Sequence, residues 1–225
     1  MFKKRIFIHV LVIFMAFSFT SCISIIEKVF FAKNGSGTYT LTVDMSKVAN
    51  MMAMLGEDNE ELNSSMGELT SGFDKAKAKI EAIDGIYNVR NDINKENLII
   101  TISFDFENAE ALNRGISQYT HGDKPGPVEQ YVFYTQKKKT ITRSSVDLIS
   151  EALGSALEEQ GGADMDLSAI LSDMYLENVI EFERNIKSYS NLEYSKEDPK
   201  TITWRKYLFN KNDEDKSIGV TVKTK

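Results

Sequence analysis

Alternating apolar and polar residues predict β-strands along much of the chain. In one such segment Tyr39, Leu41 and Val43 fall on one face and threonines on the other. Turn-forming residues between apolar runs, such as Asn34-Gly35, predict hairpins. The predicted strands are 24–32, 38–45, 86–93, 98–106, 130–135, 140–143, 179–184, 192–194, 201–209 and 218–223.

Apolar residues at helical spacing predict helices between the hairpins. Ala76, Ile80 and Ile83 recur at this spacing, and Ser46 and Asn108 are suited to cap the helices that follow them. The predicted helices are 47–55, 65–83, 109–119, 146–159 and 166–174. Together these patterns predict an α+β fold, with mostly antiparallel hairpins and several helices packed on the sheet. We expect a single compact domain, with a subdivision in the loop 121–129 left open.

The first residues have the composition of a secretory signal peptide. Three basic residues precede an uncharged apolar run, 6–19, which is too short to span a bilayer as a helix. The segment ends in Phe19-Thr20-Ser21-Cys22, which resembles the lipobox of bacterial lipoproteins. The resemblance implies a diacylglyceryl group on the Cys22 thiol, cleavage between Ser21 and Cys22, and acylation of the new amino terminus, for example by palmitate.

Removal of residues 1–21 leaves a mature domain at 22–225 and shifts the net charge from −6 to −9, because three basic residues and no acid are lost. An acidic exported domain is unsuited to binding nucleic acid. The single cysteine excludes an internal disulfide. We expect the domain to sit close to the membrane through acylated Cys22. Ile23 and Ser24, which are not acidic, favour the outer membrane over the inner one.

Two clusters are candidates for ligand binding. Methionine suits adaptable apolar surfaces, so a methionine-rich helix could line a groove for an acyl chain or a partner helix, or it could simply face the core. The methionines concerned are Met45, Met51, Met52, Met54 and Met66.

The basic run Lys137-Lys138-Lys139 could contact phosphate headgroups, or it could be a solvated hairpin tip.

Catalytic and metal-binding patterns are weak. His121 lies near Asp123 and Ser117, but the chain has no Gly-x-Ser-x-Gly nucleophile motif. The acid clusters at 57–61 and 213–215 lack the oxygen spacing of a calcium loop. We therefore expect no metal site, no cofactor and no enzymatic activity.

The order of elements resembles the LppM-like domain of bacterial lipoproteins, from about Gly35 to Val222. The resemblance implies an envelope lipoprotein that binds a lipid or a partner protein, and it does not imply an enzyme. Two alternatives remain open: an assembly subunit of an envelope complex, and a hydrolase using a carboxylate or His121. The segments that carry the resemblance are Gly35–Asp44, Leu98–Phe104 with Ala109–Leu112, and Thr201–Trp204.

Overall fold

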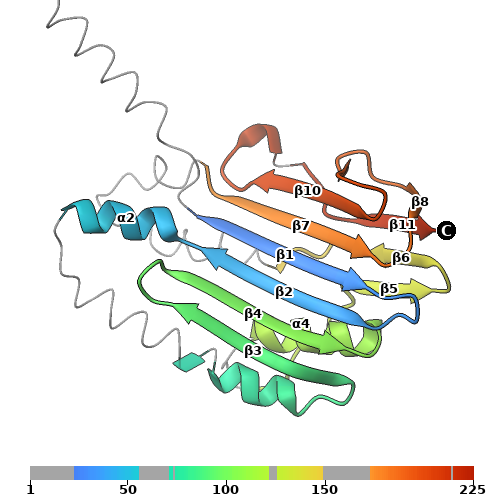
Figure 1. The fold of residues 1–225 in the computed structure, drawn as a ribbon, viewed down its shortest axis with the longest axis horizontal. Helices are drawn as coiled ribbons and strands as arrows, with labels where there is room; N and C mark the ends of the chain where they lie inside the picture. Colours follow the sequence, from blue (N-terminus) through green and yellow to red (C-terminus); the bar gives the residue numbers. More distant parts are fainter. Residues whose placement is uncertain (1–22, 56–70, 73, 122–125, 149–172, 214) are drawn as a thin grey trace, which may run out of the picture.

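The computed structural model describes residues 23–55, 71–72, 74–121, 126–148, 173–213 and 215–225. Two β-sheets form the framework (Figure 1). The large sheet consists of β3 (Ile86–Asn94), β4 (Ile99–Phe106), β2 (Gly37–Asp44), β1 (Ser24–Phe31), β7 (Tyr175–Phe182), β10 (Thr201–Tyr207) and β9 (Ser195–Lys196), in that spatial order. The small sheet consists of β5 (Tyr134–Lys137), β6 (Thr140–Arg143), β11 (Val220–Thr224) and β8 (Ile186–Tyr189).

The α+β prediction is confirmed, and antiparallel pairs dominate both sheets. The exception is the centre of the large sheet, where β1 and β7 run parallel from Ser24 beside Tyr175 to Phe31 beside Phe182. This pair joins segments about 150 residues apart, and a hairpin pattern cannot predict it. The two strands therefore start at one end of the sheet and finish together at the other.

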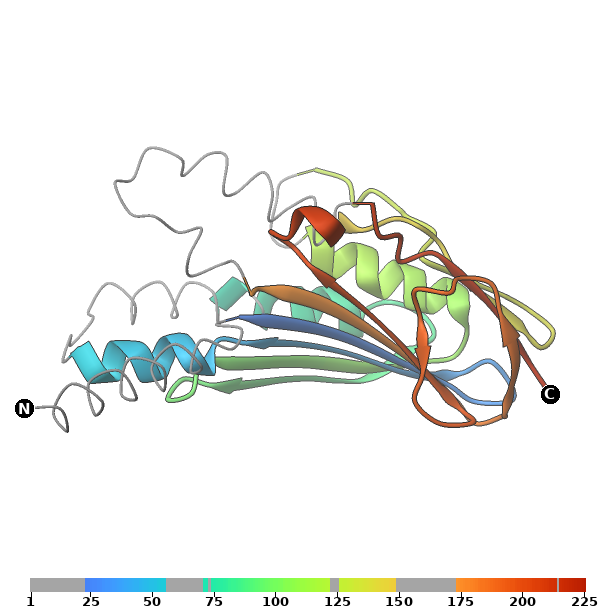
Figure 2. The same cartoon turned by 90° about the horizontal axis from the view of Figure 1, so that it is seen from above.

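Helices lie on one face of the large sheet, as Figure 2 shows for α4 (Ala109–His121) and the helical residues 74–81. Asn108 caps α4, because its Oδ1 accepts hydrogen bonds of 3.0 Å from the amides of Glu110 and Ala111. The remaining described helices are α2 (Ser46–Leu55), which continues from β2, and the short 3₁₀ helix η1 (Lys211–Asp213).

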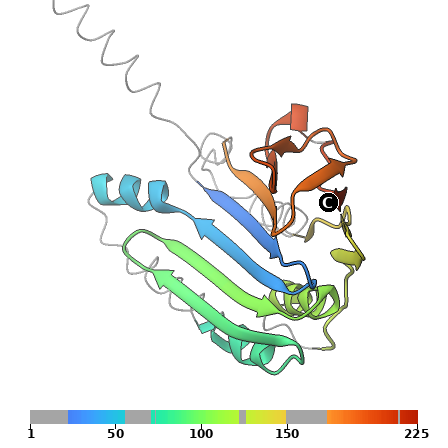
Figure 3. The same ribbon diagram turned by 45° about the vertical axis from the view of Figure 1, so that its right-hand side comes forward.

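The small sheet lies over the same face of the large sheet as α4 (Figure 3), and both sheets contribute to one core. Along β4 and β7 every second side chain is buried, whereas the threonines of β2 occupy the opposite face. Aromatic rings fill the space between the sheets. Phe31 contacts Phe106, Tyr134 and Phe182 at centroid distances of 5.5–6.0 Å.

One of the predicted elements is wrong, and a second is contradicted only at its described end. The segment 192–194 is a turn in which Leu192 is 91% exposed, and the strands of this region, β8 and β9, lie before and after it. In β8 only Ile186 is buried, so four residues give too little alternation to be recognised. The helix predicted at 166–174 lies mainly outside the described residues; at its described end residue 173 is in a turn, and buried Met174 leads directly into β7.

Other predicted elements agree in part. Strand β5 begins at Tyr134 rather than at residue 130, because the amides of Phe133 and Tyr134 bond to Oδ1 of Asn113. The helix predicted at 65–83 is helical at 71–72 and 74–81 among its described residues, and Gly85 follows with φ of 82°. The helix predicted at 146–159 lies mainly outside the described residues.

Gly115 of α4 lies directly against side chains of the large sheet. A Cβ added there would lie 2.6 Å from Cζ of Phe104 and 2.7 Å from Cδ1 of Ile86, both in the core. We expect Gly115→Ala to lower the free energy of unfolding by about 1–2 kcal/mol, since overpacking outweighs the gain in helix propensity. Denaturant unfolding measures the change. Gly72→Ala is the control, because its added Cβ meets no described atom within 4 Å; equal effects at both sites would contradict the close-packing explanation.

Candidate functional site

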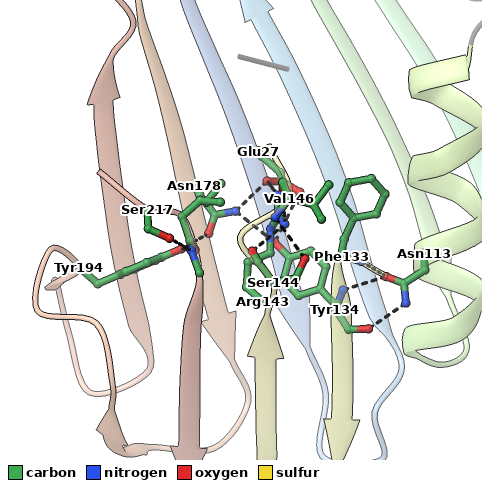
Figure 4. Close-up of polar contacts among 12 residues, drawn as sticks. Glu27, Asn113, Phe133, Tyr134, Arg143, Ser144, Val146, Asn178, Tyr194 and Ser217 are labelled. Atoms are coloured by element: carbon green, nitrogen blue, oxygen red, sulfur yellow. Dashed lines mark hydrogen bonds and ion pairs between the residues drawn. The ribbon is translucent and has the colours of Figure 1, made fainter. Parts of the chain in front are cut away.

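A network of buried polar side chains connects the two sheets (Figure 4). Glu27 on β1 is the register partner of Asn178 on β7, and both point inward from the large sheet. Tyr134 on β5 is the register partner of Arg143 on β6, and this pair faces them from the small sheet. The network is thus built from two neighbouring pairs, one in each sheet.

Glu27 is the acceptor at the centre of the network. Its Oε2 accepts hydrogen bonds from Nδ2 of Asn178 at 2.9 Å and from Nη2 of Arg143 at 3.4 Å. The Tyr134 hydroxyl lies 3.5 Å from Oε1 and accepts a bond from Asn178 at 3.1 Å. The Tyr194 hydroxyl shares its proton between Oδ1 of Asn178, at 2.8 Å, and the carbonyl oxygen of Ile218, at 2.7 Å.

Arg143 is almost completely enclosed by the protein. Its Nη1 donates to the carbonyl oxygens of Ser144 and Val146, and its guanidinium lies over the rings of Phe133 and Tyr134, 5.4 and 5.1 Å from their centroids. Only its Nε has no partner among the described residues. These contacts compensate most of the cost of removing the guanidinium from water.

Burial and charge together raise the pKa values of the arginine and the tyrosines at this network. Burial alone would lower the pKa of Arg143, but the carboxylate of Glu27 raises it above its ordinary value. Burial, together with the charge of Glu27, raises the pKa of Tyr134 and Tyr39. Burial likewise raises the pKa of Tyr194. With Glu27 and Arg143 only 2% and 4% exposed, the network can hold the sheets together but offers no surface to a solute.

The second feature is the basic end, defined here as Lys33, Lys137, Lys138, Lys139 and Arg184. It lies where the β1–β2 turn, the β5–β6 turn and the residues after β7 meet (Figure 1). A shallow depression, open to solvent, is lined by all of these cations except Lys137. No aspartate or glutamate lines the pocket, and apolar side chains such as Phe31 and Phe182 form part of its wall.

The cations of the basic end differ in whether an acidic side chain pairs with them. Lys33 is paired with Glu183, with Nζ 3.0 Å from Oε1, and its backbone amide donates to Oε2 at 2.9 Å. These bonds from Lys33 lower the pKa of Glu183. Among the described residues, no acidic side chain lies within 4.0 Å of the charged groups of Lys138, Lys139 or Arg184. Three of the four pocket cations therefore have no acidic partner among the described residues.

Lys138 occupies a backbone conformation that lysine rarely adopts. Its φ is 57° in the two-residue turn between β5 and β6, where glycine or asparagine is preferred. A left-handed conformation costs a residue with a Cβ about 1–2 kcal/mol.

The structure brings only some of the predicted site residues together. Met45 packs partly buried against Leu98, Ile100 and Ile102, so at this position the core interpretation applies. Met51, Met52 and Met54 belong to α2, but their side chains, like the whole of Met66, lie outside the described part. Ser21 and Cys22 also lie outside it, whereas Lys138 and Lys139 line the basic pocket.

Ser117 and His121, the residues considered for catalysis, do not form a nucleophile and its base in the described part of the structure. Ser117 is buried, and its Oγ accepts a hydrogen bond from the amide of Tyr131 at 3.1 Å. His121 is the last residue of α4, and Asp123 lies outside the described residues. Asp213, from the second acid cluster, forms an ion pair with Lys216, with Oδ1 2.9 Å from Nζ. Its Oδ2 accepts a hydrogen bond from the backbone amide of Tyr207.

Within the part of the chain that the structure covers, no group of three or more histidine, cysteine or acidic side chains is arranged to hold a metal ion. No helix in that same part is both long enough and apolar enough to cross a bilayer. The network residues were missed by sequence analysis. The signal that could have found them is a polar residue at an inward position of an otherwise apolar strand, as at Glu27 and Asn178.

The contribution of the buried Glu27–Arg143 pair to the stability of the domain can be measured by substituting one partner. We expect Arg143→Met to lower the free energy of unfolding by about 3–5 kcal/mol, because the Glu27 carboxylate is left buried without its partner. Arg205→Met, which breaks the half-exposed pair with Glu177, is the control and should cost about 1 kcal/mol or less. Addition of Glu27→Gln to Arg143→Met should recover part of the loss, and equal costs for both arginines would contradict a central role for the network.

Lys138 provides a second stability measurement. We expect Lys138→Asn to raise the free energy of unfolding by about 0.5–1 kcal/mol, because asparagine adopts the left-handed conformation more readily. Lys139→Asn is the matched control, since Lys139 has no positive φ and the same charge is removed. A similar gain for both variants would instead indicate relief of charge repulsion. Thermal and denaturant unfolding distinguish the two explanations.

No protein-family model matches the sequence, and no curated protein matches it significantly. Among solved structures, the chain is similar to the folded domain of LppM from Mycobacterium tuberculosis, determined by NMR. The two chains are 7% identical, the match covers 92% of this chain and 91% of the other, and the TM-score is 0.40. The functional conclusion therefore rests on the residues of this chain.

Proposed function

We propose that the chain is a bacterial envelope lipoprotein anchored through Cys22, and that its domain is a non-catalytic binding module for a lipid or protein of the envelope. The observation that carries the proposal is the position of β1. This strand begins at Ser24, two residues after Cys22, and forms the centre of the large sheet. Acyl chains on Cys22 would thus be joined almost directly to the core of the domain.

The direction of β1 places the basic end of the module far from its anchored end. An eight-residue strand spans about 25 Å at 3.2–3.4 Å per residue. The basic end lies beyond Phe31, at the opposite end of β1 from Cys22. This geometry favours a ligand away from the anchoring bilayer over the headgroups of that bilayer. We place the anchor in the outer membrane, because Ile23 and Ser24 are not acidic.

Assembly by strand addition has less support from the sheet edges. Edge strand β3 carries an irregularity between Tyr87 and Arg90, with Asn88 at φ of 53°, and its outward residues include Arg90 and Asp92. Edge strand β9 has two residues. Bulges, charges and short length all hinder pairing with a further chain. These features favour the binding module over an assembly subunit.

A hydrolase is also less well supported. Ser117 is 1% exposed, and its Oγ is engaged by the amide of Tyr131. The carboxylate of Glu27, the most buried one among the described residues, is held in the ion pair with Arg143. A general acid or base must reach the proton that it transfers, and neither group is accessible to a substrate.

The anchor is tested by Cys22→Ala. We expect this variant to lose incorporation of radiolabelled palmitate and to move from the membrane fraction to the soluble one, because the thiol that receives the diacylglyceryl group is absent. Ser18→Ala, in the same leader, is the control and should leave labelling unchanged. Continued labelling of Cys22→Ala, or an unlabelled wild-type chain, would refute the anchor.

A further inference from the structure

We infer that the basic end is a binding site for a phosphate-bearing ligand, held in the pocket between Lys138, Lys139 and Arg184. The inference rests on the proposed function only for the direction in which the site faces, away from the anchored end. The site itself is defined by residues of the described domain.

The pocket is built on a connected framework rather than on a single hairpin tip. Thr224 at the end of β11 donates from its amide, at 2.9 Å, and from Oγ1, at 3.2 Å, to the carbonyl oxygen of Lys139. The Lys33–Glu183 pair joins the β1–β2 turn to the residues after β7. Arg184 is the neighbour of Glu183 in sequence. Three separate segments therefore hold their cations around one pocket.

Charge indicates the class of ligand. The chain as a whole is acidic, with a net charge of −6, yet the residues lining the pocket include four cations and no acid. Three of these cations have no acidic partner among the described residues, so they repel one another. An anion with several oxygens would relieve this repulsion and could bond to the arginine fork and both lysines at once.

The wall of the pocket strengthens this attraction. Phe31 and Phe182 are each 2% exposed, and Ile141 beside them is 4% exposed. Charges beside an apolar wall interact in a lower effective dielectric than charges in open water. The side chain of Lys138 is presented here although its turn position favours glycine or asparagine.

The test uses the acylated protein reconstituted in nanodiscs of neutral phosphatidylcholine. Isothermal titration with inorganic pyrophosphate measures binding to a soluble phosphate, and flotation with phosphatidylglycerol vesicles measures binding to phosphate in a facing membrane. We expect Lys139→Gln/Arg184→Gln to weaken at least one of these interactions by about tenfold or more, and high salt to weaken it as well. Lys47→Gln/Lys95→Gln, outside the basic end, is the control with the same charge change and should bind like the wild type.

Each outcome decides the inference. Pyrophosphate binding lost in the pocket variant identifies a soluble phosphate ligand, and vesicle binding alone lost in that variant identifies a membrane headgroup. Absence of both interactions in the wild type, or equal binding by pocket and control variants, would overturn the site and leave a solvated hairpin end. Lys138→Asn, which we expect to be more stable than the wild type, should also bind more weakly, so misfolding cannot explain the loss. Pyrophosphate binding needs no membrane, so failure of the Cys22 anchor would leave this result intact.

Discussion

The buried pair of Glu27 and Arg143 is the interaction on which the arrangement of the two sheets depends. A carboxylate at the centre of an apolar sheet is tolerated only if another element supplies a cation and further donors. β6 supplies the cation, and β7 supplies the amide of Asn178. An apolar contact would allow the small sheet several positions, whereas the directional bonds to Glu27 favour one.

This constraint also explains how the basic end is assembled. Arg143 fixes β6, and the two-residue turn before β6 then places Lys138 and Lys139 beside the end of β1. The parallel pairing of β1 with β7 brings Phe182, and hence Arg184, to the same end. The buried pair thus lies on β1 and β6, and the pocket cations lie in the turns beside these strands and just after β7. The position of the pocket cations therefore follows from the position of the buried Glu27–Arg143 pair.

Local features of the fold were predictable from sequence, whereas long-range ones were not. The hairpin around Asn34-Gly35 and the cap at Asn108 depend on neighbouring residues, and both occur as predicted. The β1–β7 pair and the facing of Glu27 by Arg143 join residues more than 100 positions apart. In a sequence, Arg143 is simply a charged residue that ends a short strand. Likewise, the lysine run was recognised as a candidate, but its pocket partner Arg184 was not.

The separation of the two ends of β1 gives the domain a direction. The strand that would carry the lipid anchor at one end carries the wall of the basic pocket at the other, and Glu27 lies between them. Because β1 is hydrogen-bonded on both sides, to β2 and to β7, it cannot bend independently of the sheet. In a domain joined to a membrane through such a strand, the basic pocket would lie about 25 Å along β1 from the anchored end. That property suits recognition of a component across the envelope better than recognition of the bilayer beneath.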